Sequence, residues 1–427
     1  MLTCTTMQRG IAFILLLLFF ISTKSGGDSE GDGEFLIAQL DYQRQQESHQ
    51  IDSFIKALHT RGLFNGTLLV ARRGDIVYHQ SMGVANRVTG DTITNDMPYQ
   101  MASVSKPITA SAIMLLVQQG EISTEDKITK YFPELMQFNK VKIKHLLTHT
   151  SGIPDYIYRL QLEWEKQKND YYMSNEDLVS FYSIKKYRCM YTPGYRYDYS
   201  NTNYALLASI VERVTEQRFS DFVKAEIFDP LGMCNTHVFN PATDSANGPT
   251  PILGYRWTGR SWLEYGTDYR NGIAGDKGVY STADDMMRFS KGFDADHLWC
   301  NETCDDIFKT TYTRGRGQSE YGYGWRMREW DSMPVVLHYG FWNSFRTGLI
   351  EFPESDVTFV ILNNFTGSSG GRVNNRDLII RELMKIMFPD EPILLQQAKI
   401  EDHNDEGTET EGGGEPTDET PADSTED

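Results

Sequence analysis

The usual motifs of metal and nucleotide sites are missing from this sequence. It contains no H-E-x-x-H and no C-x-x-C, and its nine histidines are scattered singly along the chain. The glycine-rich patterns that hold phosphates, G-x-x-x-x-G-K-S/T and G-x-G-x-x-G, do not occur either. We therefore expect neither a metal nor a nucleotide cofactor, so any chemistry must come from the side chains themselves.

Basic residues are outnumbered in this chain. It has 41 Lys and Arg against 59 Asp and Glu, which gives a formal net charge of -18 at pH 7, and it has no basic stripe. A nucleic-acid partner is therefore not expected. Twelve of the acidic residues fall within 401–427, where Lys and Arg are absent and apolar residues are almost absent. We expect residues 400–427 to be an acidic, disordered tail.

No apolar run is long enough to span a bilayer comfortably. The run Ile11–Ile21 has eleven residues, follows Arg9 and precedes small and polar residues. Spanning the hydrocarbon core takes about 20 apolar residues, whereas this layout is typical of a secretory signal peptide. We expect a cleaved signal peptide at residues 1–25, a linker at 26–50, and a secreted or periplasmic protein without stable membrane insertion. An uncleaved N-terminal membrane anchor is the alternative.

Cysteine is scarce, with five residues in 427. Cys4 lies in the expected signal peptide, which leaves Cys189, Cys234, Cys300 and Cys304. The spacing of Cys300 and Cys304 allows a small local disulfide in an oxidising compartment. The sequence leaves the pairing of the other two open.

The stretch Met101–Gly120 contains the first chemical motif, S-x-x-K. Ser103 and Lys106 are three residues apart and therefore share one face of a helix. Pro107 is tolerated only in a first helical turn, which places the start of the helix close to Ser103. There the hydroxyl lies at the positive end of the helix dipole, where a developing oxyanion is stabilised. Ser103 is thus a candidate acyl-transfer nucleophile, with Lys106 placed to act on its proton.

Two further matches to S-x-x-K show that the pattern alone is unspecific. They are Ser53–Lys56 and Ser183–Lys186. The neighbours of Ser53 form the apolar side of an amphipathic stretch, and the neighbours of Ser183 are basic and typical of a solvated face. Other residues must therefore identify the nucleophile.

A second motif, Y-x-N, precedes a segment with the apolar spacing of a helix. Tyr199 and Asn201 open this segment. Tyr199 can serve as a general base if a nearby ammonium, that of Lys106, lowers its pKa. Asn201 offers an amide to a substrate carbonyl and to the lysine. A packed tyrosine before a capped helix is the alternative, and Tyr269–Asn271 is a rival match.

The third motif, H-x-G, consists of His338 and Gly340. It falls in a region where three successive strands are predicted, at Val335–Tyr339, Phe345–Phe352 and Val357–Asn363. The glycine would let backbone and substrate approach closely, and the amide of Phe341 would then pair with that of Ser103 as an oxyanion hole. A histidine that simply ends a strand is the alternative. Arg346, in an R-T-G match on the next strand, is a rival third motif.

In this order, S-x-x-K, Y-x-N and H-x-G resemble the motifs of the serine beta-lactamase-related family. That family includes class C beta-lactamases, D,D-carboxypeptidases, D-aminopeptidases and esterases. Several connecting stretches resemble it as well, at Leu146–Pro154, Asp229–Met233, Gly275–Thr282 and Tyr321–Trp325. The resemblance runs from about Gly66 to Met387, and we expect one serine hydrolase domain at residues 51–390.

The resemblance implies an α/β (α+β) fold of the beta-lactamase/transpeptidase type. This fold has an antiparallel sheet flanked by helices, a mostly helical second lobe and an active site between the two. The implied roles are Ser103 as nucleophile, Lys106 and Tyr199 as proton-transfer partners, and, as substrate-binding residues, Asn201, His338, Gly340 and Phe341. No cofactor and no metal are implied. His149 is expected to be scaffold, and Asn240–Asn271 a long irregular connection at the rim of the pocket.

One departure from the family pattern bears on the substrate. Class C beta-lactamases carry Lys-Thr-Gly at the third motif, and the lysine helps to hold the carboxylate of the drug. His338 is a weaker, pH-dependent cation, and Arg346 is a candidate replacement. If His338 assists an anionic substrate, activity on it should rise as the pH falls through about 6.5.

We expect a secreted serine hydrolase that cleaves a small peptide, amide or ester substrate through an acyl-enzyme on Ser103. The peptidase and esterase branches fit its third motif best. A true beta-lactamase is one alternative. A non-catalytic, penicillin-binding-like sensor or binding module is the other.

Overall fold

The computed structural model describes most of the chain between residues 29 and 389. Described are residues 29–163, 171–244, 250, 252–293, 298–315, 317–330, 332–366 and 375–389. All of them belong to the first of two compact units, Met1–Ile393 and Leu394–Asp427. The expected signal peptide at 1–25 and the expected acidic tail at 400–427 lie outside the described residues.

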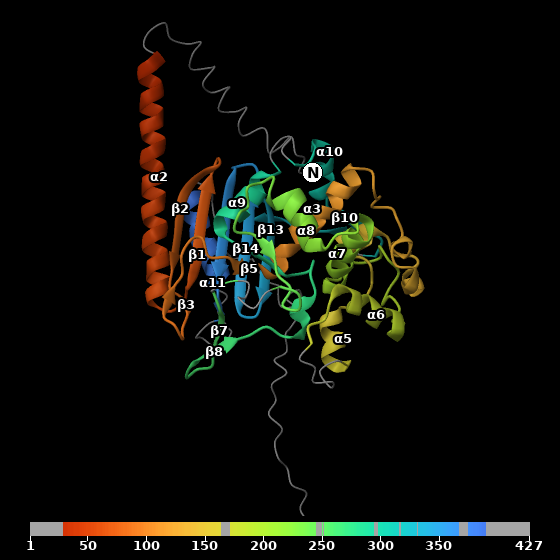
Figure 1. Cartoon of the computed structure of the whole chain (residues 1–427). Helices are drawn as coiled ribbons and strands as arrows, with labels where there is room; N and C mark the ends of the chain where they lie inside the picture. Colours follow the sequence, from red (N-terminus) through yellow and green to blue (C-terminus); the bar gives the residue numbers. More distant parts are fainter. Residues whose placement is uncertain are drawn as a thin grey trace, which may run out of the picture. The chain divides into compact units, whose positions relative to one another are not determined.

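A six-stranded sheet, antiparallel throughout, forms the centre of this unit (Figure 1). In spatial order its strands are β12 (Arg326–Trp330), β13 (Met333–Trp342), β14 (Phe345–Phe352), β15 (Val357–Asn363), β1 (Gly66–Arg72) and β2 (Asp75–Met82). The three predicted strands are confirmed. The second and third have the predicted bounds, and the first extends from 333 to 342 instead of 335 to 339.

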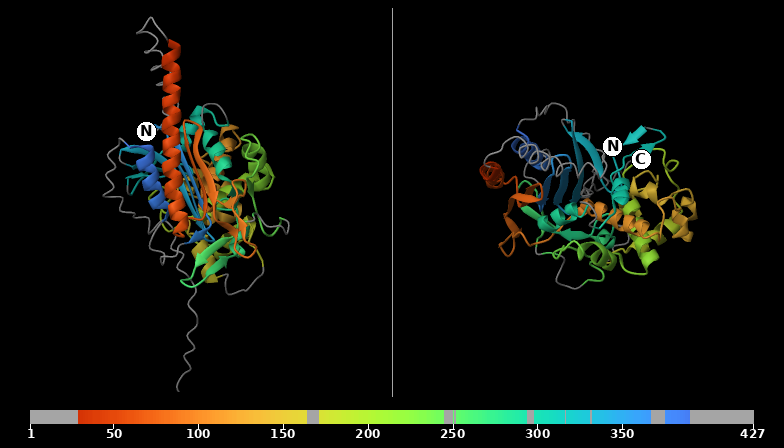
Figure 2. Two further views of the ribbon diagram at one scale, coloured as in Figure 1. Left: turned by 90° about the vertical axis from the view of Figure 1, so that its left-hand side faces the viewer. Right: turned by 90° about the horizontal axis from the view of Figure 1, so that it is seen from above.

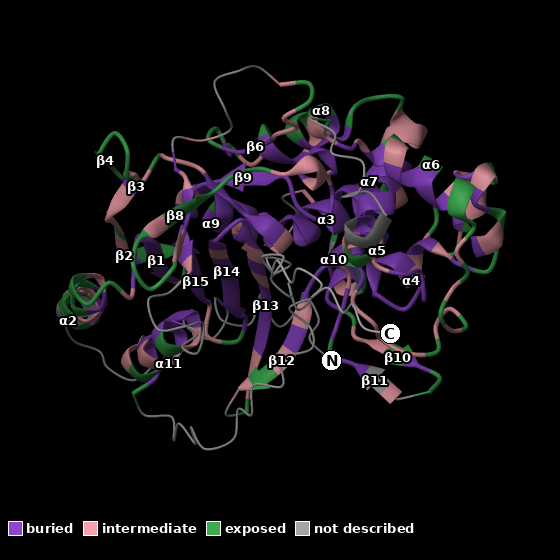
Figure 3. Ribbon diagram, turned by 90° about the horizontal axis from the view of Figure 1, so that it is seen from below, coloured by how far each residue is buried: buried purple, intermediate pink, exposed green. Residues whose placement is uncertain are grey.

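Both faces of the sheet are buried, because successive side chains of each strand point to opposite sides. In β1, Leu68 and Val70 face one hydrophobic cluster, whereas Leu69 and Ala71 face the other. Figure 3 shows β13, β14 and β15 coloured as buried between α9 (Ala283–Lys291) and α11 (Asn375–Met387).

The first of these clusters is covered by two helices from opposite ends of the described chain. Helix α2 (Ser29–Thr60) places Ile51, Ile55 and Leu58 in it, and α11 contributes Ile379 and Leu383. Figure 2 shows the two helices on the same side of the sheet. Residues 29–50, which we expected to form part of a linker, are the first part of α2.

The other face of the sheet supports the helical lobe, in which α3 (Ser105–Gln118) packs against α7 (Asn201–Thr215). The shorter helices of this part are α4 (Ile143–Leu147), α5 (Tyr156–Glu163), α6 (Asn175–Lys185), α8 (Phe219–Val223) and α10 (Asn301–Ile307). Short turns of other helical types are η1 (Ala102–Val104), η2 (Ile128–Lys130), η3 (Pro133–Phe138), η5 (Lys224–Phe228) and η6 (Tyr269–Gly272). The fold is therefore the expected antiparallel sheet with flanking helices and a mostly helical second lobe.

Four small sheets complete the part of this unit that the structure describes. Their strands are β3 (Val84–Asn86) with β4 (Asp91–Thr92), β5 (Tyr99–Gln100) with β9 (Val279–Ser281) and β6 (His237–Val238), β10 (Thr311–Thr313) with β11 (Gly317–Ser319), and β16 (Phe365–Thr366) with β7 (Gly254–Trp257) and β8 (Trp262–Tyr265). The expectation of an irregular connection at Asn240–Asn271 is wrong where β7 and β8 form a hairpin. The indoles of Trp257 and Trp262 pack at 5.2 Å across that hairpin, which is the cross-strand contact that stabilises it.

The disulfide that the spacing of Cys300 and Cys304 allows is not formed in the structure. The two residues lie at the N-cap and in the first turn of α10, where the hydroxyl of Thr303 lies 3.1 Å from the Cys300 sulfur. Cys304 instead points into the core, where it is buried.

Gly340 lets β13 pack directly on the turn that contains Ser103. A Cβ atom at this position would lie 2.3 Å from the carbonyl oxygen of Met101 and 2.2 Å from the hydroxyl of Thr347. The same hydroxyl donates a hydrogen bond to the Met101 carbonyl at 2.7 Å. Residues of β13 and β14 thus hold η1 against these two strands of the sheet.

We therefore expect Gly340→Ala to destabilise the protein. The added methyl must displace backbone atoms, and overpacking of this kind costs about 1–3 kcal/mol. Gly266→Ala is the matched control, because a Cβ there meets nothing within 4 Å. Urea unfolding measures both variants against the wild type. Equal unfolding midpoints for the two variants would contradict the close approach of β13 to η1.

Candidate active site

Ser103 and Lys106 meet as the sequence predicts. Ser103 lies in η1, and α3 begins two residues later at Ser105, so that Pro107 falls in its first turn. The Lys106 amine donates a hydrogen bond to the Ser103 hydroxyl at 3.0 Å. Ser103 is half-buried, whereas the lysine side chain is fully buried. A nucleophile that a substrate can reach is thus paired with an amine removed from water.

Two further oxygens fix the Lys106 amine. It donates to the side-chain carbonyl of Asn201 at 2.8 Å and to the backbone carbonyl of Asp276 at 2.9 Å. Burial lowers the pKa of Lys106 to about 7, although the carboxylates of Asp276 and Asp155 oppose this shift. The cations Lys277 and Arg326 add to the lowering. The amine is therefore neutral in a large fraction of molecules at neutral pH, when it can accept a proton.

Asn201 is held at the first position of α7 by the carboxylate of Asp155. The same oxygen, Oδ2, accepts hydrogen bonds from the Asn201 backbone amide at 2.7 Å and from its side-chain Nδ2 at 2.9 Å. Because Nδ2 is engaged by Asp155, the amide oxygen points toward Lys106. The predicted contact between Asn201 and Lys106 is present. Asp155, which orients Asn201, belongs to none of the three motifs.

Tyr199 joins the same group of residues. Its hydroxyl forms a hydrogen bond with Ser103, and the Lys106 amine lies 4.9 Å from the centroid of its ring. We expected the lysine to lower the pKa of Tyr199, but burial raises that pKa well above its usual value of 10.0. The shift that favours a base falls on Lys106 instead. Burial disfavours the charged form of both groups, which lowers the pKa of the amine and raises that of the phenol.

His149 holds the backbone on both sides of Tyr199. Its carbonyl accepts from the amide of Asp198 at 2.8 Å, and its Nδ1 accepts from the amide of Ser200 at 3.2 Å. Its ring lies 4.3 Å from the Tyr199 ring, and its backbone has a φ of +52°. Burial, aided by the charge of Lys106, lowers the pKa of His149 well below its usual value. These contacts agree with the scaffold role expected for this residue.

His338 is buried, and both of its ring nitrogens have partners. Nδ1 donates to the carbonyl of Tyr339 at 2.8 Å, so Nε2 is the acceptor for the Tyr321 hydroxyl at 3.1 Å. Burial and the nearby Arg326 lower the pKa of His338 well below 6.5. The ring is therefore neutral at pH 7, and the expected rise in activity as the pH falls through about 6.5 has no basis in this residue.

Arg326, at the start of β12, places a positive charge beside these residues and lowers the pKa of Lys106 and of His338. Its guanidinium carbon lies 5.7 Å from the ring of Tyr199 and 6.0 Å from that of Tyr321. The Arg346 guanidinium carbon instead lies 4.8 Å from the ring of Phe341, its cross-strand neighbour. Sequence reasoning singled out Arg346 and missed Arg326, because no motif marks a residue brought in by strand pairing.

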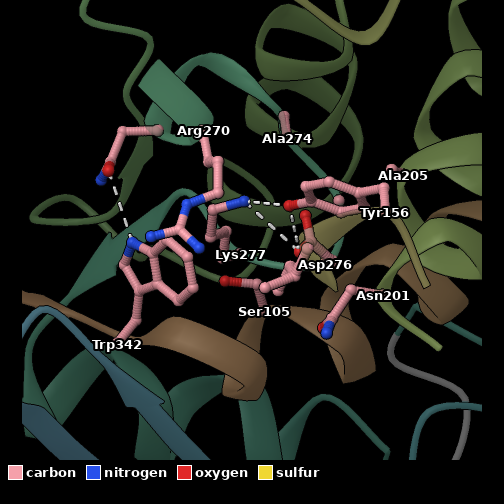
Figure 4. A network of polar contacts seen from close by, with 12 residues as sticks. Ser105, Tyr156, Asn201, Ala205, Arg270, Ala274, Asp276, Lys277 and Trp342 are labelled. Atoms are coloured by element: carbon pink, nitrogen blue, oxygen red, sulfur yellow. Dashed lines mark hydrogen bonds and ion pairs between the residues drawn. The ribbon is translucent and has the colours of Figure 1, made fainter. Parts of the chain in front are cut away.

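A second polar network includes Asp276, whose backbone carbonyl accepts from Lys106 (Figure 4 shows the network). Tyr156 donates to the carboxylate of Asp276 at 2.8 Å and accepts from the amine of Lys277. The side chains of Lys277 and Arg270 lie against the Trp342 indole, with their charged groups 4.9 and 4.7 Å from its ring. The stretch Gly275–Thr282 was noted only for its family resemblance, and no sequence signal showed that its charges lie beside Lys106.

The rival motif matches lie in other surroundings. Ser53 is in α2, and Ser183 is in α6, where its hydroxyl donates to the carbonyl of Glu134 at 3.4 Å. Asn271 is in η6 and accepts from the Trp342 indole at 3.4 Å. Among the described residues, the match at Ser103 is the only one of the three S-x-x-K matches whose lysine contacts the tyrosine and the asparagine of a Y-x-N motif.

Within the described part of the chain, no cluster of three or more His, Cys, Asp or Glu side chains is arranged to hold a metal ion. The described helices also include none with the length and apolar character needed to cross a membrane.

A family model named Beta-lactamase matches residues 51–383, well over half of the chain. The protein belongs to the beta-lactamase family. Members of this family are serine hydrolases, and the family resemblance of the motifs is thereby confirmed.

Known relatives within the beta-lactamase family agree with this placement. Penicillin-binding protein 4* of Bacillus subtilis (strain 168) is 30% identical over 331 residues, which are 75% of this chain and 72% of that protein. Esterase EstB of Burkholderia gladioli is 29% identical over 308 residues, or 64% of this chain and 76% of that protein. The crystal structure of a penicillin-binding protein from Bacillus halodurans superimposes with a TM-score of 0.66 at 26% identity, covering 77% of this chain and 98% of that one.

The burial of Lys106 predicts a specific pH dependence of stability in this family member. Its pKa is about 7 in the folded chain against 10.5 as the ordinary value. Between these values the unfolded chain binds a proton that the folded chain does not, so the folded state gains stability as the pH rises. Relative to Lys106→Met, the wild type should gain up to about 1.4 kcal/mol per pH unit. Urea unfolding of both proteins at pH 7, 8 and 9 measures this difference. A constant difference would mean that folded Lys106 stays protonated.

Proposed function

We propose that this protein is a secreted serine hydrolase that cleaves an amide or ester bond through an acyl-enzyme on Ser103. The observation that carries the proposal is the fully buried amine of Lys106, 3.0 Å from the Ser103 hydroxyl and with a pKa of about 7. A structural lysine has no need of a hydroxyl partner open to substrate, whereas a nucleophilic serine requires a base within hydrogen-bond reach. Secretion rests on the composition of residues 1–25.

In the proposed reaction, neutral Lys106 takes the proton of Ser103 as the serine oxygen attacks the substrate carbonyl. Tyr199 keeps its proton at pH 7 because its pKa is raised, and its hydroxyl is bonded to Ser103. It is therefore placed to donate a proton to the leaving alcohol or amine, and Lys106 returns that proton to Tyr199. Water then attacks the acyl-enzyme by the reverse sequence and releases the acid. Atoms and charges balance without a cofactor.

The substrate carbonyl would lie between η1 and β13. The backbone amides of Ser103 and Phe341 are the proposed oxyanion donors, since acyl transfer requires two donors where the charge develops. Asn201 would contact the amide or carbonyl of the substrate on the opposite side. The packing of Gly340 on Met101 supports this arrangement, because it brings the two elements together.

The peptidase or esterase branch is favoured over a true beta-lactamase. At the third motif, His338 is neutral and bonded to Tyr321 and Tyr339, so it offers no cation to the carboxylate of a drug. The relatives named above include an esterase and a penicillin-binding protein. We therefore propose small peptides, amides or esters as substrates, without a metal or nucleic-acid partner.

Ser103→Ala should abolish turnover and covalent labelling by a fluorophosphonate. The reason is that the acyl group is carried on this hydroxyl alone. Ser53→Ala and Ser183→Ala, the serines of the other two S-x-x-K matches, are the matched controls and should label like the wild type. Intact-mass and peptide mass spectrometry locate the adduct. Label retained in Ser103→Ala, or found on either control serine, would refute the proposal, and so would unlabelled wild-type protein, as expected of a binding module.

Small esters should be better substrates than beta-lactams. Because the third-motif residue carries no charge at neutral pH, the carboxylate of nitrocefin gains no ion pair there. We expect kcat/KM for p-nitrophenyl acetate or a D-alanyl amide to exceed that for nitrocefin, as measured by steady-state kinetics at pH 7. Nitrocefin turnover above both by tenfold, about 1.4 kcal/mol of transition-state preference, would identify a beta-lactamase instead.

A further inference from the structure

Asp276 and Lys277 form a buried ion pair beside the contact that orients Lys106. Their side chains are 1% and 3% exposed, and their charged groups are 3.4 Å apart. Tyr156 bonds to both, as Figure 4 shows. Removing two charges from water costs free energy that their mutual attraction often fails to offset. Stability alone therefore does not account for the pair, and its position next to a reactive amine suggests a functional role.

The turn that contains this pair is fastened to the helix that contains Lys106. Three hydrogen bonds join the turn to α3: Lys106 to the Asp276 carbonyl at 2.9 Å, Thr109 to the Gly275 carbonyl at 2.7 Å, and the Val279 amide to the Ser105 hydroxyl at 3.2 Å. The charges of residues 276 and 277 are thus held at a fixed distance from the Lys106 amine.

We propose that Asp276 and Lys277 are a positioning pair that sets how readily Lys106 takes up and releases its proton. The inference rests on the proposed role of Lys106 as proton acceptor for Ser103. The backbone oxygen of Asp276 orients the amine, and its carboxylate favours the ammonium form. The cation of Lys277 opposes the ammonium form and so offsets the carboxylate. The two residues act through Lys106.

Other ionisable side chains also face the Lys106 amine from neighbouring elements: Asp155, Arg326, Tyr199, Tyr204, His149 and His338. The carboxylate of Asp155 favours the charged form of Lys106, and the guanidinium of Arg326 opposes it. The tyrosine rings lie 4.9 and 5.8 Å from the amine. Both histidines are neutral at pH 7 because burial lowers their pKa. Substitutions at 276 and 277 leave all six side chains in place, and the charge of Asp276 also raises the pKa of Asp155 and of Tyr199.

The test is the pH profile of kcat/KM for a p-nitrophenyl ester, measured on the full chain. Its acidic limb reports the pKa of the base in the free enzyme. Lys277→Gln removes the opposing cation but keeps a hydrogen-bond donor, so the limb should move to higher pH by on the order of one unit. Adding Asp276→Asn to this variant removes the carboxylate and leaves the backbone oxygen in place. The limb of the double variant should move back toward that of the wild type.

Lys277→Arg is the matched control, because it keeps the cation. Its limb should stay within a few tenths of a unit of the wild type, whereas equal shifts for Gln and Arg would indicate a packing effect and overturn the proposal. An unmoved limb in Lys277→Gln would overturn it as well. If Lys277→Gln does not fold, the double variant and Lys277→Arg are compared with the wild type in its place. The acidic limbs of the double variant and of Lys277→Arg must then lie close to that of the wild type. A displaced limb in the double variant would contradict the proposal that the charges of Asp276 and Lys277 offset each other.

A second readout separates this inference from the proposed function. In a Ser103→Ala background, NMR titration of the Lys106 side chain follows its pKa without turnover. This pKa should rise in Lys277→Gln and fall back in the double variant. If Ser103→Ala keeps full activity, the proposed function itself is wrong. If activity depends on Ser103 but neither the limb nor the NMR pKa moves, only the role of the pair is wrong.

Discussion

The amine of Lys106 is buried away from solvent, and hydrogen bonds to oxygens from three separate elements stabilise it there. They are the hydroxyl of Ser103 in η1, the side chain of Asn201 in α7 and the carbonyl of Asp276 in the turn before β9. A buried amine without such partners costs several kcal/mol. Since each acceptor is distant in sequence from the others, the position of this one nitrogen depends on how α3, α7 and that turn pack together.

Two glycines allow these elements to pack closely, because a side chain at either position would collide with a neighbouring backbone. Gly275 has a φ of +101°, and a Cβ there would lie 2.4 Å from the carbonyl of Tyr204 in α7. Gly340 likewise allows a close approach, where β13 meets the turn that contains Ser103. The nucleophile is thus fixed to the sheet and the amine to the helical lobe. The two groups already lie within hydrogen-bond distance, as expected of a preorganised site that avoids reorganisation during the reaction.

The features predicted correctly from the sequence are those that depend on residues near one another in the chain. Apolar segments separated by turn residues located β14 and β15, and a spacing of three placed Lys106 beside Ser103. Features that depend on long-range packing were missed. Arg326 reaches Tyr199 through strand pairing, and the β7–β8 hairpin is held by β16 from a distant part of the chain. The neutral state of His338 follows from burial, which no local pattern reveals.

Among His149, His338, Tyr199 and Lys106, one group has a pKa near neutrality. His149 and His338 are buried close to the cations Lys106 and Arg326, and both effects lower their pKa values far below 6.5. Tyr199 is shifted the opposite way, well above 10.0. Of these four residues, Lys106 alone has a pKa of about 7. Among these four residues, a pH response near neutrality is therefore assigned to the lysine and not to either histidine. The charges that tune this lysine are those of Asp276, Asp155, Lys277 and Arg326.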